Sequence, residues 1–168
     1  MIRQMHKPGI AIDIPGFGKR QIRTIISDYT GTLSRRGKLS PGVKSRLLRL
    51  QKLVDVKIVT ADTYGMAAKQ LKGIAAPHFL RRASGQDKEK CDFAKIFDLC
   101  HVTAFGNGNN DRLLLRAVKS AGGLAIAVDN GEGVALDALL AANIFISGAA
   151  NALDLILNPK ALKATLRS

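Results

Sequence analysis

The sequence has no tryptophan, and aromatic residues make up only 5% of its 168 residues. Aliphatic side chains must therefore form most of the core, and an apolar content of 46% is enough for one. No apolar run approaches the roughly 18 to 20 residues that cross a bilayer. Residues 1–8 also lack the apolar stretch of a signal peptide. We therefore expect a single cytoplasmic domain over residues 1–168, with no membrane association.

Cysteine is also scarce, with only Cys91 and Cys100 in the chain. We expect both in or just past one helix, where their spacing would put them on roughly opposite faces at about 100° per residue. They form neither a disulfide framework nor a metal pair. The three histidines likewise show no metal-binding spacing.

Positive charge is abundant but unevenly distributed along the chain. The net charge is +13, yet residues 121–168 contain only 3 of the 26 lysines and arginines, with 4 acidic residues. Such asymmetry suggests that the basic part meets an anionic partner: a phosphate compound, a nucleic acid or an acidic surface. The alternative is a solvated face that only keeps the protein in solution.

Apolar patterning predicts strands that alternate with helices of about ten residues. An N-terminal hairpin is expected first, with Ile10–Ile14 as one arm, residues 15–18 as the turn, and residues 21–27 returning straight into Asp28. Residues 31–40 are too rich in glycine and charge for a buried element. Alternation then predicts a three-layer α/β sandwich with a mainly parallel central sheet. The expected strands are 55–60, 78–80, 101–105, 124–128 and 144–146, and the expected helices are 41–53, 63–72, 88–99, 111–121, 132–142 and a C-terminal stretch broken at Asn158-Pro159.

Polar residues follow four of these strands. Asp28 ends an apolar run, Thr60-Ala61-Asp62 ends the next strand, Lys88 and Lys90 open a later helix, and 106–111 reads Gly-Asn-Gly-Asn-Asn-Asp. Functional groups in such sheets gather beyond the carboxyl ends of the strands. Carboxylate, hydroxyl, lysine and amide groups are the parts needed to handle a phosphoryl group with a divalent cation. Any one of these could instead be ordinary turn or helix-capping chemistry.

These pieces, in this order, resemble the haloacid dehalogenase (HAD) superfamily of phosphohydrolases, and more narrowly its soluble members related to the phosphorylation domain of P-type ATPases. Residues 28–32 resemble that group's Asp-Lys-Thr-Gly-Thr, and residues 60–62 its Thr-Gly-Asp. Residues 106–111 resemble Gly-Asp-Gly-x-Asn-Asp, and 127–147 resembles the segments that close the domain. Four motifs in order over most of the chain make the signal specific.

The resemblance implies a HAD-like Rossmannoid fold in which Asp28 attacks phosphorus and becomes an aspartyl phosphate. Thr60 and Ala61 would bind the phosphoryl group, and a lysine would neutralise it. Lys90 is preferred to Lys88, because this choice brings residues 93–97 into register with the family's apolar helix positions.

Mg²⁺ is the cofactor that the resemblance implies. The side chain of Asp28 and the backbone carbonyl of Thr30 would bind it, with Asn107 and Asp111 as the remaining metal-site residues. Asp111 would orient either the metal shell or the lysine.

Two positions depart from the family pattern. Thr30 stands where phosphatases usually carry an acid that protonates the leaving group, so a factor of about 10² to 10⁴ in rate is missing for poor leaving groups. Asn107 stands where the family has a metal-binding aspartate, which lowers the expected Mg²⁺ affinity. Both changes favour a slow enzyme, or a protein that has lost turnover and kept binding.

The chain also leaves no room for an inserted cap domain, since the segments between Asp28, Thr60 and Lys90 are filled by core elements. We therefore expect an open site that accepts a macromolecule or is closed by a second copy, and we favour a homo-oligomer, with the N-terminal hairpin as the candidate interface.

The leading functional hypothesis is a Mg²⁺-dependent phosphohydrolase that acts on a phosphorylated small molecule or nucleotide, slowly on alkyl monoesters, with weak ATPase activity. The alternative is a catalytically degenerate regulatory protein that binds phosphate or a protein partner. A nucleic-acid-binding protein is the third hypothesis, suggested by charge but supported by no binding motif or aromatic stacking platform in the sequence.

Overall fold

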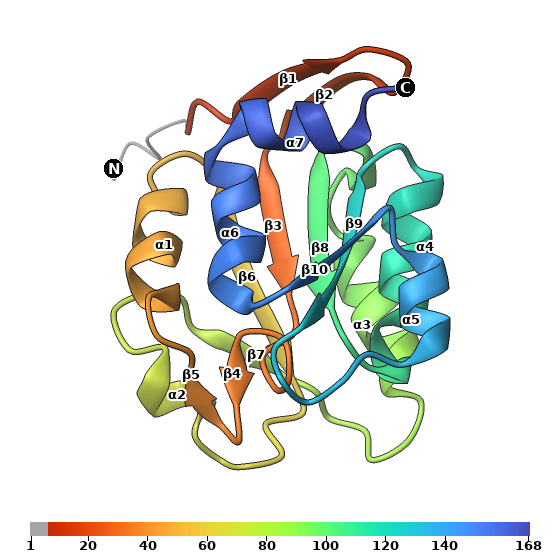
Figure 1. Cartoon of the computed structure of the whole chain (residues 1–168). Helices are drawn as coiled ribbons and strands as arrows, with labels where there is room; N and C mark the ends of the chain where they lie inside the picture. Colours follow the sequence, from red (N-terminus) through yellow and green to blue (C-terminus); the bar gives the residue numbers. More distant parts are fainter. Residues whose placement is uncertain (1–6) are drawn as a thin grey trace, which may run out of the picture.

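The central sheet of the computed structural model, which describes residues 7–168, has six parallel strands. Their order across the sheet is β10-β9-β8-β3-β6-β7 (Figure 1). The predicted α/β architecture is thus confirmed. Residues 1–6 lie outside the described residues. They include most of residues 1–8, for which no signal peptide was expected. The strands are β3 (Thr24–Ser27), β6 (Asp55–Thr60), β7 (Pro77–Phe79), β8 (Val102–Gly106), β9 (Leu124–Asp129) and β10 (Ile144–Ser147).

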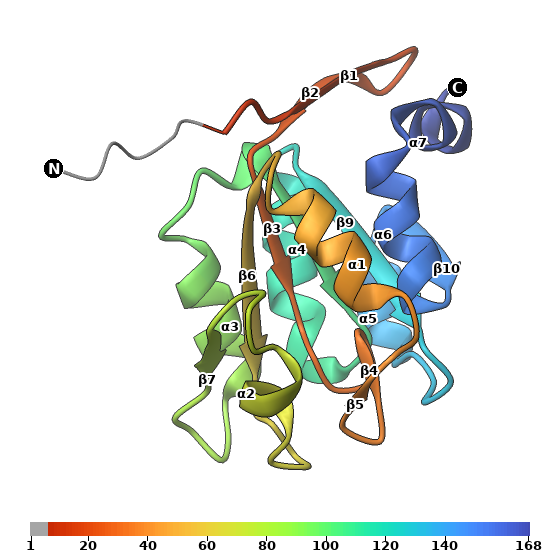
Figure 2. The same cartoon turned by 90° about the vertical axis from the view of Figure 1, so that its left-hand side faces the viewer.

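Helices cover both faces of the sheet (Figure 2). One face carries α1 (Val43–Leu50) and α6 (Ala149–Leu157), which pack against each other. The other carries α3 (Gln86–Ala94), α4 (Arg112–Ser120) and α5 (Leu136–Ala141). This arrangement gives two apolar cores, one on each side of the sheet.

The central strand β3 joins the two cores. Ile25 packs into the core under α1 and α6, while Ile26 packs into the core under α3 and α4. Both side chains are fully buried, and burial of each contributes about 1.5 to 3 kcal/mol. All four residues of β3 are buried, as expected for a strand covered on both faces, and the packing of this strand fixes the position of Asp28 at its end.

The N-terminal hairpin is present, but its return arm is two strands and not one. β1 (Ile10–Ile14) pairs antiparallel with β2 (Gly18–Ile22), whereas β3 pairs in parallel with β6 and β8. The break falls at Arg23, whose backbone amide donates to the carbonyl of His101. The chain changes partners there, so one continuous strand cannot serve both sheets.

The prediction that residues 31–40 contain no buried element was wrong. They form a small hairpin of β4 (Ser34–Arg35) and β5 (Lys38–Leu39), and Leu33 and Ser34 are buried. The cause is Tyr29, whose hydroxyl donates to the carbonyl of Gly37 at 2.7 Å and whose carbonyl accepts from Ser34 Oγ at 3.0 Å. Tyr29 thereby holds the hairpin against the body of the protein.

Several helices are shorter than predicted. α1 begins after Gly42, which has a left-handed φ of 76°, so Ser40 is not its N-cap. Only Ala67–Gln70 of the expected helix at 63–72 is α-helical, as α2. α3 ends at Ala94 and α5 begins at Leu136. The break at Asn158 is confirmed, because its side chain caps α7 (Pro159–Leu166).

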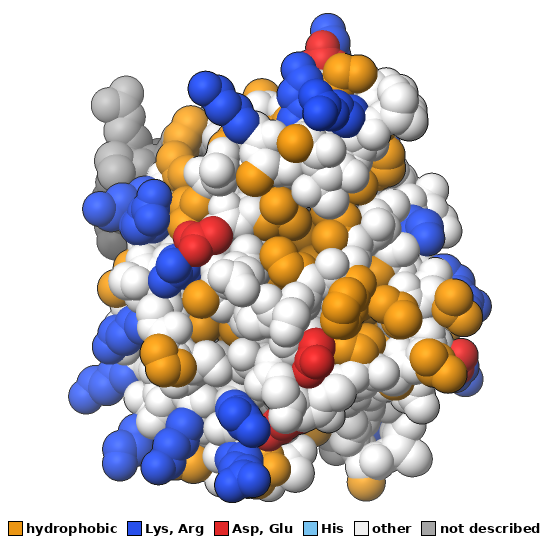
Figure 3. Space-filling model, viewed as in Figure 1, with side chains coloured by type: hydrophobic (Ala, Val, Ile, Leu, Met, Phe, Trp, Pro, Cys, Tyr) orange, Lys and Arg blue, Asp and Glu red, His pale blue; other side chains and the backbone are white. Residues whose placement is uncertain are grey.

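The charge asymmetry of the sequence is visible on the surface. Figure 3 shows lysine and arginine side chains gathered along the lower edge, below the β4–β5 hairpin and α2, and apolar side chains over α5 and β10. No lysine or arginine occurs between Lys119 and Lys160. Among the described helices, none has the length and apolar character needed to span a bilayer.

Candidate active site

Asp28 lies at the carboxyl end of the central strand, beside a buried lysine. Its carboxylate Oδ1 is 2.6 Å from Nζ of Lys90, which comes from α3. The same Nζ is 2.6 Å from Oδ1 of Asp111, at the end of the loop after β8. All three side chains are buried. The structure therefore brings together three of the predicted site residues in one hydrogen-bonded cluster.

Burial controls the protonation of this cluster. It raises the pKa of Asp28 from 3.8 to about 6, with the charge of Asp111 raising it further and that of Lys90 opposing the shift. Burial would lower the pKa of Lys90, but the carboxylates of Asp111 and Asp28 outweigh it and raise the value above its usual range. Two carboxyl groups thus share one ammonium group in this cluster, an arrangement that favours a further cation nearby.

Asp111 uses its second oxygen to shape the loop at 106–111. Its Oδ2 accepts from the backbone amides of Asn107 and Gly108, both at 2.9 Å. Gly106 permits this approach, because a β-carbon there would lie 2.5 Å from Cβ of Asp111. Both carboxylate oxygens are therefore engaged, one with the lysine and one with the loop. Of the two roles expected for Asp111, these contacts favour orientation of Lys90.

Asn107 and Asp28 meet at a third side chain, Thr32. The hydroxyl of Thr32 lies 3.2 Å from Oδ2 of Asp28 and 3.1 Å from Oδ1 of Asn107, so it can donate to either oxygen. Only glycine fits at position 31, because a β-carbon there would lie 2.5 Å from Nδ2 of Asn107. Its φ of 78° also favours glycine. Sequence reasoning placed Thr32 in the motif but gave it no role. Its spacing four residues after Asp28 was the available signal.

The oxygens near Thr32 fit a hard divalent cation. Oδ2 of Asp28 and Oδ1 of Asn107 face one hydroxyl, and within residues 7–168 the carbonyl of Thr30 accepts no hydrogen bond. The Thr30 hydroxyl is also buried without a partner. Carboxylate, amide and carbonyl oxygens form the donor set that Mg²⁺ prefers. The residues present therefore fit the predicted metal, with one carboxylate fewer than the family pattern.

Thr60 and Ala61 end β6, the strand next to β3. Thr60 is buried, and its Oγ accepts from the backbone amide of Asp62 at 2.8 Å, which leaves its proton available to a ligand. No hydrogen bond joins Thr60 to Asp28 among the described residues. Asp62 has a structural role, since its carboxylate accepts from the amides of Met66 and Ala67 at the start of α2.

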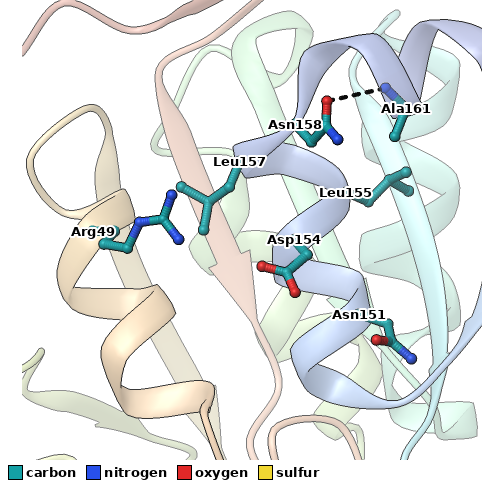
Figure 4. Close-up of a pocket in the computed structure, with 7 residues that line it drawn as sticks. All are labelled: Arg49, Asn151, Asp154, Leu155, Leu157, Asn158 and Ala161. Carbon is teal, nitrogen blue, oxygen red and sulfur yellow. Dashed lines mark hydrogen bonds between the residues drawn. The ribbon is translucent and has the colours of Figure 1, made fainter.

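Two other polar features lie apart from this cluster. Asp98, Cys100 and His101 have ligand atoms within 4.8 Å of one another, but they precede β8 and so lie at the amino end of the sheet. A cavity of about 410 Å³ lies by α1, α6 and α7 (Figure 4). Its acidic residue, Asp154, is paired with Arg46 at 2.6 Å. Neither the Asp98–Cys100–His101 cluster nor this cavity includes a predicted site residue.

Comparison with solved structures places the fold among phosphatases. The cobalt-bound deoxy-D-mannose-octulosonate 8-phosphate phosphatase of Haemophilus influenzae matches 88% of this chain and 94% of its own, with 14% identity and a TM-score of 0.64. The corresponding Moraxella catarrhalis enzyme, solved with magnesium and phosphate ions and a KDO molecule, matches 87% and 94%, with 17% identity and a TM-score of 0.57. A phosphatase of the HAD superfamily from Bacteroides thetaiotaomicron matches 98% and 97%, with 11% identity and a TM-score of 0.57. The TM-scores show a shared fold, and at these identities they show the fold alone.

Sequence comparison finds one archaeal relative. An uncharacterized protein of Methanocaldococcus jannaschii is 42% identical over 66 residues, which are 39% of this chain and 67% of the relative. No protein-family profile matches the sequence.

The buried lysine generates a prediction about stability. We expect Lys90→Met to lower the free energy of unfolding by about 3 to 5 kcal/mol, because Asp28 and Asp111 would lose their shared cation while remaining buried. Urea denaturation measures this change. Lys88→Met is the matched control, since Lys88 is exposed two residues earlier in the same helix and should change stability by no more than about 0.5 kcal/mol. Equal stability of the two variants would contradict the assigned role of Lys90.

Proposed function

The chain belongs to the same family as the M. jannaschii protein and has the fold of HAD phosphatases. We propose that it is a Mg²⁺-dependent phosphohydrolase with Asp28 as its nucleophile. The observation that carries this proposal is the buried cluster of Asp28, Lys90 and Asp111 at the end of the central strand. A buried carboxyl group with a raised pKa, such as Asp28, beside a buried lysine is typical of catalytic sites.

The chemistry has two steps. A carboxylate oxygen of Asp28 attacks phosphorus, a new phosphorus–oxygen bond forms, and the bond to the leaving group breaks. Water then attacks the aspartyl phosphate, which releases inorganic phosphate and restores Asp28. Lys90 neutralises charge on the phosphoryl oxygens because Asp111 holds its ammonium group in place. Thr60 donates its free hydroxyl proton to the phosphoryl group, beside the backbone at Ala61.

Mg²⁺ would be held by the Asp28 carboxylate, the Thr30 carbonyl and the Asn107 amide oxygen, within the loop that Asp111 shapes. When bound, it would offset the negative charge of a phosphoryl group next to a carboxylate.

Thr30 sets the range of leaving groups. A threonine hydroxyl cannot act as an acid near neutral pH, so alkyl monoesters should react slowly. Acyl phosphates, aryl phosphates and nucleoside triphosphates have good leaving groups, so their reaction rates should fall least. We therefore propose weak ATPase activity, and with it kinship with the soluble P-type ATPase-like subgroup.

The second candidate function is a degenerate phosphate-binding or regulatory protein, favoured by Thr30 and Asn107. Beryllium fluoride with Mg²⁺ separates the two, because only a competent aspartate should trap it.

A homo-oligomer is also part of the proposal, through α5 and β10. Leu136 and Leu140 on α5 are 75% and 76% exposed, and Phe145 on the edge strand β10 is 53% exposed. This region lies within the stretch that has no lysine or arginine, so two +13 chains would repel least here. The N-terminal hairpin is less suited, because its isoleucines are already buried and β1 packs against α7.

Catalysis by Asp28 leads to a direct test. We expect phosphate release from acetyl phosphate, para-nitrophenyl phosphate and ATP to require Mg²⁺ and to fall to background in Asp28→Asn, because the amide is not a nucleophile. A phosphate-release assay measures this, and Asp13→Asn, on the exposed face of the hairpin, is the matched control. Full activity in Asp28→Asn would remove the nucleophile assignment, and equal background in all three proteins would favour the regulatory alternative.

The missing carboxylate at Asn107 leads to a second test. We expect Asn107→Asp to tighten Mg²⁺ binding about tenfold, equivalent to about 1.4 kcal/mol, because it adds a charged ligand to the site. Isothermal titration with Mg²⁺ alone measures this. Asn109→Asp adds the same charge to an exposed position of the same loop and should change affinity less. Equal gains in both variants would mean that the effect is general electrostatics and not ligation.

The oligomer proposal predicts a mass by light scattering above the 18.0 kDa of one chain. We expect Leu136→Asp to lower that mass, because it places charge in the apolar contact. Leu48→Asp, at an exposed leucine on α1, should leave it unchanged. A wild-type protein that is monomeric at all concentrations tested refutes the proposal.

A further inference from the structure

Five exposed basic side chains at the carboxyl end of the sheet have no partners. They are Arg35, Arg36, Lys38, Arg81 and Arg82, here called the basic rim. Within residues 7–168 none of them makes an ion pair or a side-chain hydrogen bond. Two acids lie beside them, because Glu89 accepts hydrogen bonds from the backbone amides of residues 81 and 82, and Glu132 accepts one from the amide of Arg36. Five cations beside these two carboxylates still leave the rim with an excess of positive charge.

Contacts with residues 131–133 link the first part of the rim to Asn107 in the candidate active site. The amide of Arg36 donates to Glu132 at 2.6 Å, and Arg35 lies against Gly131, where a β-carbon would come within 3.2 Å of its Nε. The same loop accepts a hydrogen bond from Nδ2 of Asn107 at the carbonyl of Gly133. A hollow of about 530 Å³, lined in part by Arg35, continues from here.

The second part of the rim approaches from the opposite side of the site. The amide of Leu80 donates to the carbonyl of Thr60, so Arg81 and Arg82 begin directly beyond the strand that carries Thr60. Glu89, one residue before Lys90 on α3, fixes the amides of both arginines. The β4–β5 hairpin and the loop after β7, which carry the two halves of the rim, lie at the end of the sheet where β3 ends (Figure 1).

Two exposed aromatic rings accompany the rim. Tyr64 is 48% exposed and lies against Gly37, between the basic residues of the β4–β5 hairpin. Phe79 is 44% exposed at the end of β7, paired in register with Thr60. An aromatic platform was not expected from the sequence, because these residues are separated from the hairpin along the chain. Folding places them at the same edge of the sheet.

We propose that the substrate is the terminal phosphate of a single-stranded nucleic acid. The inference rests on the proposed phosphohydrolase function and names its substrate class. Lys90 and the metal are enough to neutralise the charge of a single phosphate monoester. Five further cations without ion pairs, spread over two loops, are suited to binding a chain of phosphates. Exposed aromatic rings within such a surface stack on unpaired bases. An uncapped site leaves the strand a path to Asp28.

Binding and turnover test this separately. The probe is a fluorescent, 5′-phosphorylated oligonucleotide of about 12 residues, titrated by anisotropy against Asp28→Asn protein in Mg²⁺ between about 50 and 200 mM salt. Five phosphate contacts predict a slope of log affinity against log salt of about −3.5, and Arg35→Gln with Lys38→Gln should reduce it by about 1.4. Tyr64→Ala should weaken binding about five- to 150-fold through lost stacking.

The control exchanges two lysines at the other end of the molecule. Lys160→Gln with Lys163→Gln, on exposed positions of α7, removes the same charge and should leave both binding and acetyl phosphate turnover unchanged. An equal loss of slope in the control and rim variants overturns the proposal, as does tighter binding of ATP than of the oligonucleotide, which would favour a free nucleotide.

Turnover separates this inference from the proposed function. Wild type should release phosphate from the oligonucleotide end with a lower kcat than from acetyl phosphate, because the terminal phosphate is an alkyl monoester and Thr30 supplies no acid, but with a lower KM, because the basic rim binds the strand. Acetyl phosphate turnover without oligonucleotide binding refutes the substrate class alone. Oligonucleotide binding with no Asp28-dependent turnover on any substrate refutes the phosphohydrolase alone.

Discussion

One buried ammonium group, shared by two buried carboxylates, is the interaction on which the rest of this structure depends. Lys90 joins the central strand through Asp28 and the loop after β8 through Asp111. Burial of any one of these charges without its partners would cost several kcal/mol. The cluster therefore fixes where α3, β3 and the loop meet, and its two carboxyl groups favour a further cation nearby.

Hydrogen bonds from nearby polar groups position the loops around this cluster. Asp111 holds two amides of its loop, Thr32 lies between Asp28 and Asn107, and Tyr29 anchors the β4–β5 hairpin. The hairpin brings its basic residues to the rim of the site without a cap domain over it. The buried position of Asp28 and the basic residues of the nearby hairpin are thus consequences of one set of contacts around residues 28–37.

In the proposed reaction, Thr30 and Asn107 would act on different parts of the chemistry. Thr30 would supply no acid to protonate a leaving group, which would limit the bonds that can be broken. Asn107 would offer an oxygen beside Asp28 but no charge, which would limit how tightly a metal is held. Neither change disturbs the Asp28–Lys90–Asp111 cluster, which is why a functional nucleophile remains the proposal that fits the contacts best.

The sequence by itself determined the layers of the fold and the strand ends that carry Asp28, Thr60 and Asn107, because apolar period and turn residues are local signals. Tertiary structure decided what depends on contacts between distant residues. The register of residues 93–97 favoured Lys90 over Lys88, but only the tertiary structure buries Lys90 between Asp28 and Asp111. The composition of residues 31–40 indicated an exposed loop, but a hydrogen bond from Tyr29 holds this segment as a hairpin against the protein. Tyr64 lies at the basic rim only because folding brings it beside Gly37.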